Sequence, residues 1–466
     1  MTIRQKNYLI NFHRTKRIRD WFLLISDTGD WIALDKKKYK QFISLKLEDA
    51  EFIKILEKKG LIITQDNTNL IIDKYKKRYQ YLDYKTPLHI ISITGRCNQR
   101  CLYCHSSAEP ENRNDLDLDK KTAKKIIQFI FNYPGDKLRV EFQGGETTLN
   151  KNVIEYIVTE MKSINKKYKK DIEFSLVTNL LSYDVEFIEW CICENISLTT
   201  SLDGPRELHD KNRPSFKKES SHDLVTQNIQ EIKDLYDKRI GCLMVTTKDS
   251  LNQWKEIIDE YVSKDLKEIL IKPLNKLGTA NKTWDKIGYN TESFLEFWKK
   301  SMDYIIELNK KGTKIRERYA YLAAVKILTD YDPGYTDFRS PCGAIIGQLN
   351  YSYDGSIYTC DEGKAFEIFR IGNVFEDSYQ EIINKQTTKK IVEASLLDNY
   401  ICDNCAYKPY CGICIVKSYG SEGNLIPKIP MNFEHKFHKF VFDYIFEKII
   451  FDPEVKKIFE SWLEKK

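Results

Sequence analysis

The chain has 466 residues, of which 42% are hydrophobic and 30% are charged, and we expect roughly two to four domains of an ordinary soluble protein. Its 74 basic and 68 acidic residues leave a formal net charge of +6, too small an excess on so long a chain to indicate a nucleic-acid partner. No stretch approaches about 20 apolar residues and the first residues include no apolar segment, so we expect a cytoplasmic protein without signal peptide or membrane span.

Residues 1–80 form the first predicted unit, a small winged-helix-like domain. Two apolar runs flank Asp27-Thr-Gly-Asp30, which is a hairpin signal with Gly29 in the turn. Two helical patterns follow, and the second ends at Gly60. Two short apolar runs after it are expected to pair as the wing. The expected strands are 21–25, 31–34, 61–63 and 70–72, and the expected helices lie near 36–43 and 47–58.

Residues 86–311 alternate predicted strands and helices, which indicates an α/β fold. Six strand–helix units with short apolar strands predict a parallel sheet, open or partly closed, in the form of a partial (β/α)6 barrel similar to a TIM barrel. In such barrels the chemistry lies on loops at the carboxyl ends of the strands. The expected strands are 89–94, 138–143, 173–179, 197–203, 242–247 and 269–274, and the helices between them include 122–131 and 153–163.

The rest of the chain divides into three predicted segments. Residues 312–340 are expected to form a connecting helix and loop. Residues 341–420 hold six cysteines and several glycines with little long periodicity, and such segments usually need metal to hold their fold. The tail, 421–466, is predicted to be helical.

Three cysteines, Cys97, Cys101 and Cys104, directly follow the first predicted barrel strand with the spacing C-x3-C-x2-C. Twelve cysteines without a secretion signal favour metal over disulfides. Iron–sulfur cubanes are normally held by four thiolates, so three on one loop leave one iron open to a reactant. Half of a structural zinc site is the alternative, but no second ligand pair follows at zinc-ribbon spacing.

This spacing resembles the cluster loop of the radical SAM enzymes. The resemblance implies a [4Fe–4S] cluster whose open iron is chelated by S-adenosylmethionine (SAM), which is then reductively cleaved to methionine and a 5'-deoxyadenosyl radical. Tyr103 would pack on the cluster or the adenine, and core filling is its alternative role. His105 is adjacent, but three thiolates already suffice, and we expect a plain pocket or surface histidine there.

A second match, Gly144-Gly145-Glu146, follows the next predicted strand. In the radical SAM family such a segment binds the amino group of SAM. Glycines let the backbone approach a ligand closely, and a carboxylate or carbonyl accepts hydrogen bonds from an ammonium group. Alone, the tripeptide would predict only a turn. The chain departs from the family at Thr147, where proline is common.

The third and fourth predicted strands end in further polar residues. The segment from Ser201 to Arg213 resembles the Ser-x-Asp-Gly-Pro…His-Asp…Arg stretch of peptide-modifying radical SAM enzymes. By that resemblance Ser201 would bond the SAM ribose, Asn179 would line the same edge, and Asp203 and Arg213 are further cofactor-binding candidates. A tight turn built by Gly204-Pro205 is the structural alternative, and both can hold.

The six C-terminal cysteines resemble those of the SPASM domain, which carries auxiliary iron–sulfur clusters. Two four-thiolate clusters need eight cysteines, so either one cluster is held by four, or two exist with non-cysteine or open positions. By the family's interleaving, the first, second and sixth would share one cluster and the other three the second. The cysteines are Cys342, Cys360, Cys402, Cys405, Cys411 and Cys414.

Two alternatives remain open for this segment. The family's usual last cysteine, expected after Cys414, is missing, and His435 or His438 could substitute for it or be a surface or capping residue. A zinc site formed by the two C-x2-C pairs between Cys402 and Cys414 competes with the clusters.

Asp361 directly follows Cys360. In anaerobic sulfatase-maturing enzymes an aspartate after the equivalent cysteine is the candidate proton acceptor, so the resemblance makes Asp361 the catalytic candidate. A carboxylate within reach of the substrate suits removal of a proton after hydrogen abstraction. A solvent-exposed turn residue is the alternative.

Three stretches narrow the resemblance to the His-Xaa-Ser system radical SAM maturases of the B type: 8–12, 27–31 and 340–347. The family implies a small precursor peptide and a second radical SAM maturase as partners, with a reductant such as flavodoxin or ferredoxin. Residues 1–80 resemble the precursor-peptide recognition element, which would add a leader peptide to a strand edge, and a structural cap is the alternative.

The expected function is therefore that of a radical SAM peptide maturase. The radical would take a hydrogen from a peptide carbon, and the peptide would then crosslink, epimerise or be oxidised. One alternative is a sulfatase-type maturase that oxidises a cysteine or serine of a protein. The other is a non-catalytic metal-binding partner that presents a precursor to another enzyme.

Overall fold

The structure is a computed structural model that describes residues 8–83 and 86–464. The first seven residues, on which the expectation about a signal peptide rests, lie outside the described residues. Within the described ranges, every helix is too short or too polar to cross a lipid bilayer.

A ten-stranded sheet forms the centre of the molecule, and it confirms the predicted α/β fold. The six predicted barrel strands lie side by side in parallel, in chain order, and a short β14 adds to the far edge. The carboxyl ends of all these strands therefore meet at one end of the barrel. The strands are β6 (Leu88–Thr94), β9 (Lys137–Gly144), β10 (Asp171–Val177), β11 (Ser197–Ser201), β12 (Gly241–Val245), β13 (Glu268–Lys272) and β14 (Arg316–Glu317).

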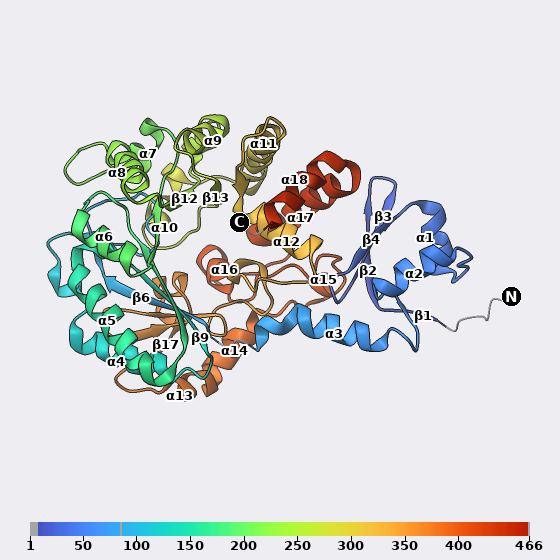
Figure 1. Cartoon of the computed structure of the whole chain (residues 1–466), viewed down its shortest axis with the longest axis horizontal. Helices are drawn as coiled ribbons and strands as arrows, with labels where there is room; N and C mark the ends of the chain where they lie inside the picture. Colours follow the sequence, from blue (N-terminus) through green and yellow to red (C-terminus); the bar gives the residue numbers. More distant parts are fainter. Residues whose placement is uncertain (1–7, 84–85, 465–466) are drawn as a thin grey trace.

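The pattern of β9 shows why the helices cover one face of this sheet. Leu138, Val140 and Phe142 are fully buried and pack with the apolar faces of α4 and α5. Glu141 and Gln143 alternate with them and line the barrel cavity. Figure 1 shows the helices around the outside of the sheet. They are α4 (Lys120–Phe131), α5 (Lys151–Tyr168), α6 (Val185–Cys193), α7 (Arg206–Asn212), α8 (Ser221–Tyr236), α9 (Trp254–Ser263), α10 (Thr279–Ile287), α11 (Thr291–Lys310) and α12 (Arg318–Leu328).

The sheet crosses the domain boundary expected at residue 341. The strand β15 (Gln348–Tyr351) pairs in parallel with β6, with Asn350 opposite Ile90. Two antiparallel strands, β16 (Ser356–Tyr358) and β17 (Arg370–Asn373), extend the sheet further. The cysteine-rich segment is thus joined to the first barrel strand, which places the residues after β16 beside the barrel opening.

The N-terminal unit confirms the predicted hairpin and both predicted helices, whereas the wing is wrong. Residues 70–72 belong to a helix, and the strand at 62–63 pairs with residues 9–10 instead. A run of three apolar residues does not distinguish a strand from a helix face. The elements are β1 (Leu9–Ile10), β2 (His13–Ile18), β3 (Trp21–Ser26), β4 (Trp31–Leu34), α1 (Lys36–Ile43), α2 (Ala50–Lys58), β5 (Ile62–Ile63) and α3 (Thr68–Tyr79).

A buried arginine at the end of α3 ties this unit to the cysteine-rich segment. Arg78 is 1% exposed and donates to the carbonyl oxygens of Lys326 and Pro409, each at 2.9 Å. The Tyr410 hydroxyl donates to the Gly29 carbonyl at 2.7 Å. Because buried backbone oxygens need such partners, the loop that holds Cys405 and Cys411 is fixed against the N-terminal unit.

The C-terminal segment is helical, as predicted. Its long helix α17 (Phe433–Phe451) packs Phe437 on Trp298 of α11, and its Phe446 meets Trp31 of the N-terminal unit edge to face at 5.2 Å. In Figure 1, α17 and α18 lie between the barrel helices and the N-terminal unit. The remaining helices are α13 (Tyr379–Asn384), α14 (Gln386–Ala394), α15 (Tyr400–Asp403), α16 (Ile415–Glu422) and α18 (Pro453–Leu463).

Glu317 gives the fold a pH dependence that can be measured. It is fully buried at the start of α12, and burial raises its pKa from 4.5 to about 7 although the Ala320 N–H bonds its carboxylate. The folded state therefore holds this proton more tightly than the unfolded state. Stability is fully present below about pH 4.5 and falls as the pH rises through 7, by on the order of 3 kcal/mol.

We expect Glu317→Gln to be stabilised relative to the wild type at pH 8 but not at pH 5, because the amide carries no charge to bury. Thermal unfolding of both proteins at the two pH values measures this difference. Glu207→Gln, at an exposed first-turn glutamate of α7, is the control for the substitution. The same difference at both pH values would show that Glu317 is not charged while buried.

Candidate active site and cysteine clusters

A cavity of about 300 Å³ opens at the carboxyl ends of the barrel strands. Cys97, Cys101 and Cys104 all line it, as the loop after β6 predicts. The ends of β9 to β13 and the pair Asp361-Glu362 complete its wall. The structure thus brings residues that are more than 250 positions apart in the chain to one opening.

The cysteine loop is held by an arginine and by the close approach of β9. Arg96 donates two hydrogen bonds to the Asp117 carboxylate, at 2.9 and 2.8 Å, and one to the Leu149 carbonyl.

Burial raises the pKa of the Cys101 thiol to about 12, and burial also raises the pKa of the Cys97 thiol. Burial thus favours the protonated form of these two thiols, and metal binding would release their protons.

The two glycines at the end of β9, Gly144 and Gly145, allow the close approach of this strand to the cysteine loop. Gly144 has φ +145°, and the Gly145 N–H donates to the Thr94 carbonyl at 2.8 Å. A Cβ atom on Gly145 would lie 2.0 Å from the Arg96 carbonyl oxygen. Only glycine fits between the two backbones, so the turn presents its own backbone to the cavity.

Glu146 does not line the cavity, although the sequence analysis placed it at the cofactor. Its side chain is buried, and its carboxylate accepts hydrogen bonds from the Thr178 hydroxyl at 2.6 Å, the Asn179 N–H at 2.7 Å and the Thr148 hydroxyl at 2.7 Å. Burial raises the pKa of Glu146, although these hydrogen bonds act to lower it. Glu146 therefore joins the glycine turn to the end of β10.

Asn179 and Ser201 line the cavity on neighbouring strands, as expected. The Asn179 amide donates to the Asn98 side-chain oxygen at 2.7 Å and lies 3.7 Å from the Cys97 sulfur. These polar groups therefore stand on the cavity wall beside the cysteine loop.

Tyr103 and Arg213 line the cavity, but Asp203 lies behind them, fully buried. The Tyr103 hydroxyl and Arg213 Nε, at 3.3 Å, both donate to the Asp203 carboxylate. A second guanidinium nitrogen of Arg213 is 3.8 Å from the Cys101 sulfur. Asp203 therefore positions the cation beside the cysteine loop and does not face a ligand.

Asp361 also lines the cavity, in a pair with His105 that was not predicted from the sequence. His105 Nε2 is 2.8 Å from Asp361 Oδ2, and the Lys364 ammonium is 2.7 Å from Oδ1. Burial alone would raise the pKa of Asp361, but Lys364 and His105 outweigh it and hold that pKa well below its usual range. Asp361 is thus a paired cavity residue and not an exposed turn residue.

Two more cavity carboxylates were missed. Glu362 pairs with Lys272 at 3.2 Å, and Glu141 accepts a hydrogen bond from the Ser175 hydroxyl at 3.2 Å. Alternation along β9 was the available signal for Glu141, because its neighbours in the strand are buried on the other face. The pairing of Glu362 depends on the tertiary structure alone.

The six C-terminal cysteines fall into two groups of three. Cys342, Cys360 and Cys414 are buried in one core cluster, where Cys414 is hydrogen-bonded to Cys342. Cys402 and Cys411 pack in a separate small cluster, and the Cys405 N–H donates to the Cys402 carbonyl at 3.1 Å. This is the interleaving expected from the SPASM resemblance, and it separates Cys414 from the other three members of the alternative zinc site. The groups are Cys342, Cys360, Cys414 and Cys402, Cys405, Cys411.

Among the described residues, no three or more histidine, cysteine and carboxylate side chains are arranged around a position for a single metal ion. A cubane is larger than one ion, and its four irons take one thiolate each. The three-cysteine groups are therefore better suited to clusters than to zinc.

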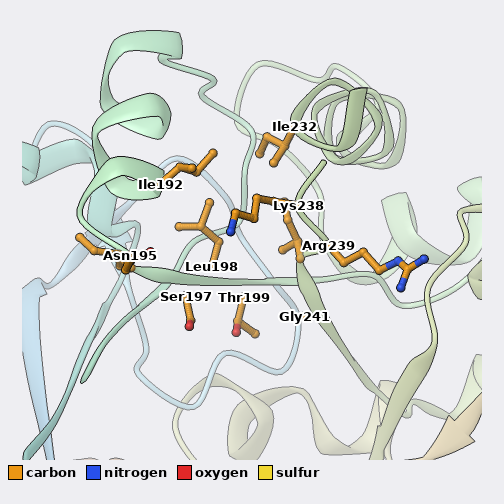
Figure 2. Close-up of a pocket in the computed structure, with 11 residues that line it drawn as sticks. Ile192, Asn195, Ser197, Leu198, Thr199, Ile232, Lys238, Arg239 and Gly241 are labelled. Atoms are coloured by element: carbon orange, nitrogen blue, oxygen red, sulfur yellow. The ribbon is translucent and has the colours of Figure 1, made fainter. Parts of the chain in front are cut away.

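A second cavity, of about 390 Å³, lies at the amino end of β11 and β12 (Figure 2). Figure 2 shows the Lys238 side chain turned toward Leu198, and Arg239 pointing away. None of the candidate site residues named above lines it. It lies at the strand ends where barrels of this type do not place their chemistry.

Comparison with known proteins agrees with the geometry. The family model of the radical SAM superfamily matches residues 91–261, and that of SPASM, an iron–sulfur cluster-binding domain, matches residues 342–411. This chain is a radical SAM enzyme with a SPASM domain. A [4Fe–4S] cluster and SAM are therefore cofactors of the barrel, and the SPASM domain binds auxiliary iron–sulfur clusters.

Three relatives illustrate the membership. The cysteine-type anaerobic sulfatase-maturating enzyme of Clostridium novyi (strain NT) is 25% identical over 68% of this chain and 84% of its own. The solved structure of native anSMEcpe with bound AdoMet has a TM-score of 0.68 at 20% identity, over 80% of this chain and all of that one. The structure of Streptococcus suis SuiB bound to precursor peptide SuiA has a TM-score of 0.53 at 15% identity. The match covers 90% of this chain and 98% of the SuiB chain. The two solved structures show that the radical SAM/SPASM fold is shared.

The residues at the barrel cavity fit these cofactors. Three thiols line one cavity with no fourth cysteine among its lining residues, which matches a cluster with an open iron. The glycine turn beside them lies so close to the cysteine loop that a single Cβ atom on Gly145 would fill the space.

Proposed function

We propose that this radical SAM enzyme modifies a ribosomally made precursor peptide at the cavity described above. The observation that carries the proposal is the meeting of the three-cysteine loop, the glycine turn and the Asp361–His105 pair at one opening. When bound, the cluster and SAM supply a 5'-deoxyadenosyl radical that takes hydrogen from carbon.

The chain's own residues then have separate tasks. Cys97, Cys101 and Cys104 hold the cluster, and Gly144 and Gly145 bring backbone groups to SAM. Asn179, Ser201, Tyr103 and Arg213 offer polar and aromatic contacts along the neighbouring wall, where all four line the cavity. The buried Glu146 and Asp203 position these groups from behind.

Asp361 is the candidate residue for receiving a proton from the substrate. It lies on the cavity wall and its two oxygens are oriented by His105 and Lys364. A base must stand within hydrogen-bond reach of the proton that it takes, and this orientation fixes where the substrate carbon would have to lie.

The N-terminal unit supports a peptide as the substrate. Its strand β1 pairs only with β5 among the described strands, and Leu9 and Phe12 are 70% and 59% exposed. An extended leader peptide could add to such an edge through main-chain hydrogen bonds. The likeness to SuiB, solved with a precursor peptide, favours the same substrate class.

The resemblance to the His-Xaa-Ser systems adds two further partners to the proposal. They are a flavodoxin or ferredoxin as reductant and a second radical SAM maturase.

Oxidation of a cysteine or serine in a sulfatase-type protein is the second candidate. The relative from Clostridium novyi, matched over most of its length, favours it. Mass spectrometry after anaerobic incubation with SAM and dithionite separates the two. Conversion of a small peptide encoded beside the gene supports the proposal, whereas conversion of a sulfatase-motif peptide alone would replace it.

Replacement of Cys97, Cys101 and Cys104 by alanine should abolish SAM cleavage, because no thiolate would remain to hold the barrel cluster. The measurement is 5'-deoxyadenosine formed by anaerobically reconstituted protein with dithionite and SAM. The auxiliary iron should stay bound.

Cys193→Ala is the matched control, because Cys193 is exposed on α6. It should keep wild-type turnover. Undiminished 5'-deoxyadenosine from the triple variant would show that SAM is cleaved elsewhere.

A further inference from the structure

We propose that His438 is the fourth ligand of the auxiliary cluster held by Cys402, Cys405 and Cys411. The inference concerns the C-terminal segment and does not depend on which peptide the enzyme modifies.

The three cysteines of this group lack a fourth. The other C-terminal cysteines, Cys342, Cys360 and Cys414, are buried together in a different core cluster, where Cys414 is hydrogen-bonded to Cys342. The cysteines outside the motifs lie on α6 and β12 of the barrel. A four-coordinate cluster at Cys402, Cys405 and Cys411 therefore needs a ligand other than cysteine.

His438 lies at this group. It is 2% exposed, and its Nδ1 is 3.9 Å from the Cys411 sulfur. The same nitrogen is 2.8 Å from the carbonyl oxygen of Gly412, the residue that follows Cys411. Histidines that bind metals commonly donate one ring N–H to a backbone carbonyl, which orients the other nitrogen toward the metal. The Gly412 carbonyl supplies that orienting bond.

Two aromatic rings pack against His438. Its ring meets Phe338 edge to face at 4.5 Å and lies 5.8 Å from Phe437. Imidazole can replace thiolate on an iron–sulfur cluster.

The course of α17 explains how one helix reaches this position. Glu434, four residues earlier on the same face, accepts a hydrogen bond from the Cys414 N–H at 2.8 Å and pairs with Lys417 at 3.2 Å. The helix therefore lies across both cysteine groups, with one buried polar side chain at each.

His435 is the other histidine that the sequence offered, and the structure places it elsewhere. It is only half-buried, and its backbone N–H bonds to the Asn432 side chain that caps α17. Among the described residues it has no hydrogen bond to a cysteine. His435 is consequently the matched control for His438, three residues away on the same helix.

The test uses full-length protein in which Cys97, Cys101 and Cys104 are alanine, so that the remaining iron is auxiliary. The protein is produced with ¹⁵N-histidine, reconstituted anaerobically and reduced with dithionite. Pulsed EPR should then detect coupling between the reduced cluster and a histidine nitrogen. The coupling should persist in His435→Ala and vanish in His438→Ala, which should also bind less iron and sulfide.

His438→Cys keeps the test decisive if the alanine variant folds poorly. As a ligand substitution it should retain iron, lose the nitrogen coupling and lower the reduction potential, because a thiolate adds negative charge to the cluster. A role confined to hydrogen bonding of Gly412 predicts no coupling in the wild type, and that result would overturn the proposal. Coupling that survives in His438→Ala would do the same. Neither result bears on SAM cleavage at the barrel, which the cysteine variants test separately.

Discussion

Gly145→Ala should lower 5'-deoxyadenosine formation by about 100-fold or more, because the new methyl group has no space. Its Cβ would lie 2.0 Å from the Arg96 carbonyl oxygen and 2.5 Å from the Arg96 carbonyl carbon. Both are backbone atoms, so no side-chain rotation relieves the contact. The turn and the cysteine loop must separate, which breaks the hydrogen bonds from Gly145 to Thr94 and from Glu146 to Arg96. Cys97 is the next residue and would move with the loop.

The measurement is anaerobic SAM turnover together with the affinity for SAM and the iron content of the variant. Gly312→Ala is the matched control, because Gly312 has φ +92° and open space at its Cβ position. That substitution adds backbone strain without a clash and lies in the loop after α11, so turnover should be retained. If Gly145→Ala keeps wild-type turnover, the contact between the glycine turn and the cysteine loop is not required for SAM cleavage.

The barrel was predictable because local patterns determine it. Strand β6 is a continuous buried run, and β9 alternates between buried and cavity-facing residues, so both are visible in the sequence. The cysteine loop follows the first strand by chain order alone. The grouping of the C-terminal cysteines was predictable only by resemblance, because spacing equally allowed a zinc site at the two C-x2-C pairs.

What the sequence could not show is which way side chains point and which distant segments meet. Glu146 and Asp203 belong to recognisable motifs, yet both are turned into the protein and bond its own groups. The contact between His105 and Asp361 joins residues 256 positions apart. It exists because β15 pairs with β6, and a four-residue strand with every side chain buried carries no periodic signal.

Asp203→Ala should destabilise the protein by about 3–5 kcal/mol, because it leaves the Arg213 cation buried without a carboxylate. Asp203 is fully buried and Arg213 is 7% exposed. The Asp203 carboxylate also accepts from the Tyr103 hydroxyl and, at 3.2 Å each, from the Asn212 amide and the Val245 N–H, so three more polar groups lose their acceptor. Arg213 lies 3.8 Å from the Cys101 sulfur, so we expect the variant to bind less barrel iron as well. Chemical unfolding followed by circular dichroism, with iron analysis, measures both effects.

A double-variant cycle separates the lost ion pair from general damage to the core. Arg213→Met in the Asp203→Ala background removes the unpaired charge, so the double variant should be destabilised by less than the sum of the two single changes. Asp249→Ala is the surface control, because Asp249 pairs with Lys211 at 2.8 Å where both side chains are partly exposed, and it should cost less than about 1 kcal/mol. Additive losses in the cycle would mean that Asp203 and Arg213 act independently. The position of Arg213 beside Cys101 would then have to be set by the backbone that follows α7 and not by the buried carboxylate.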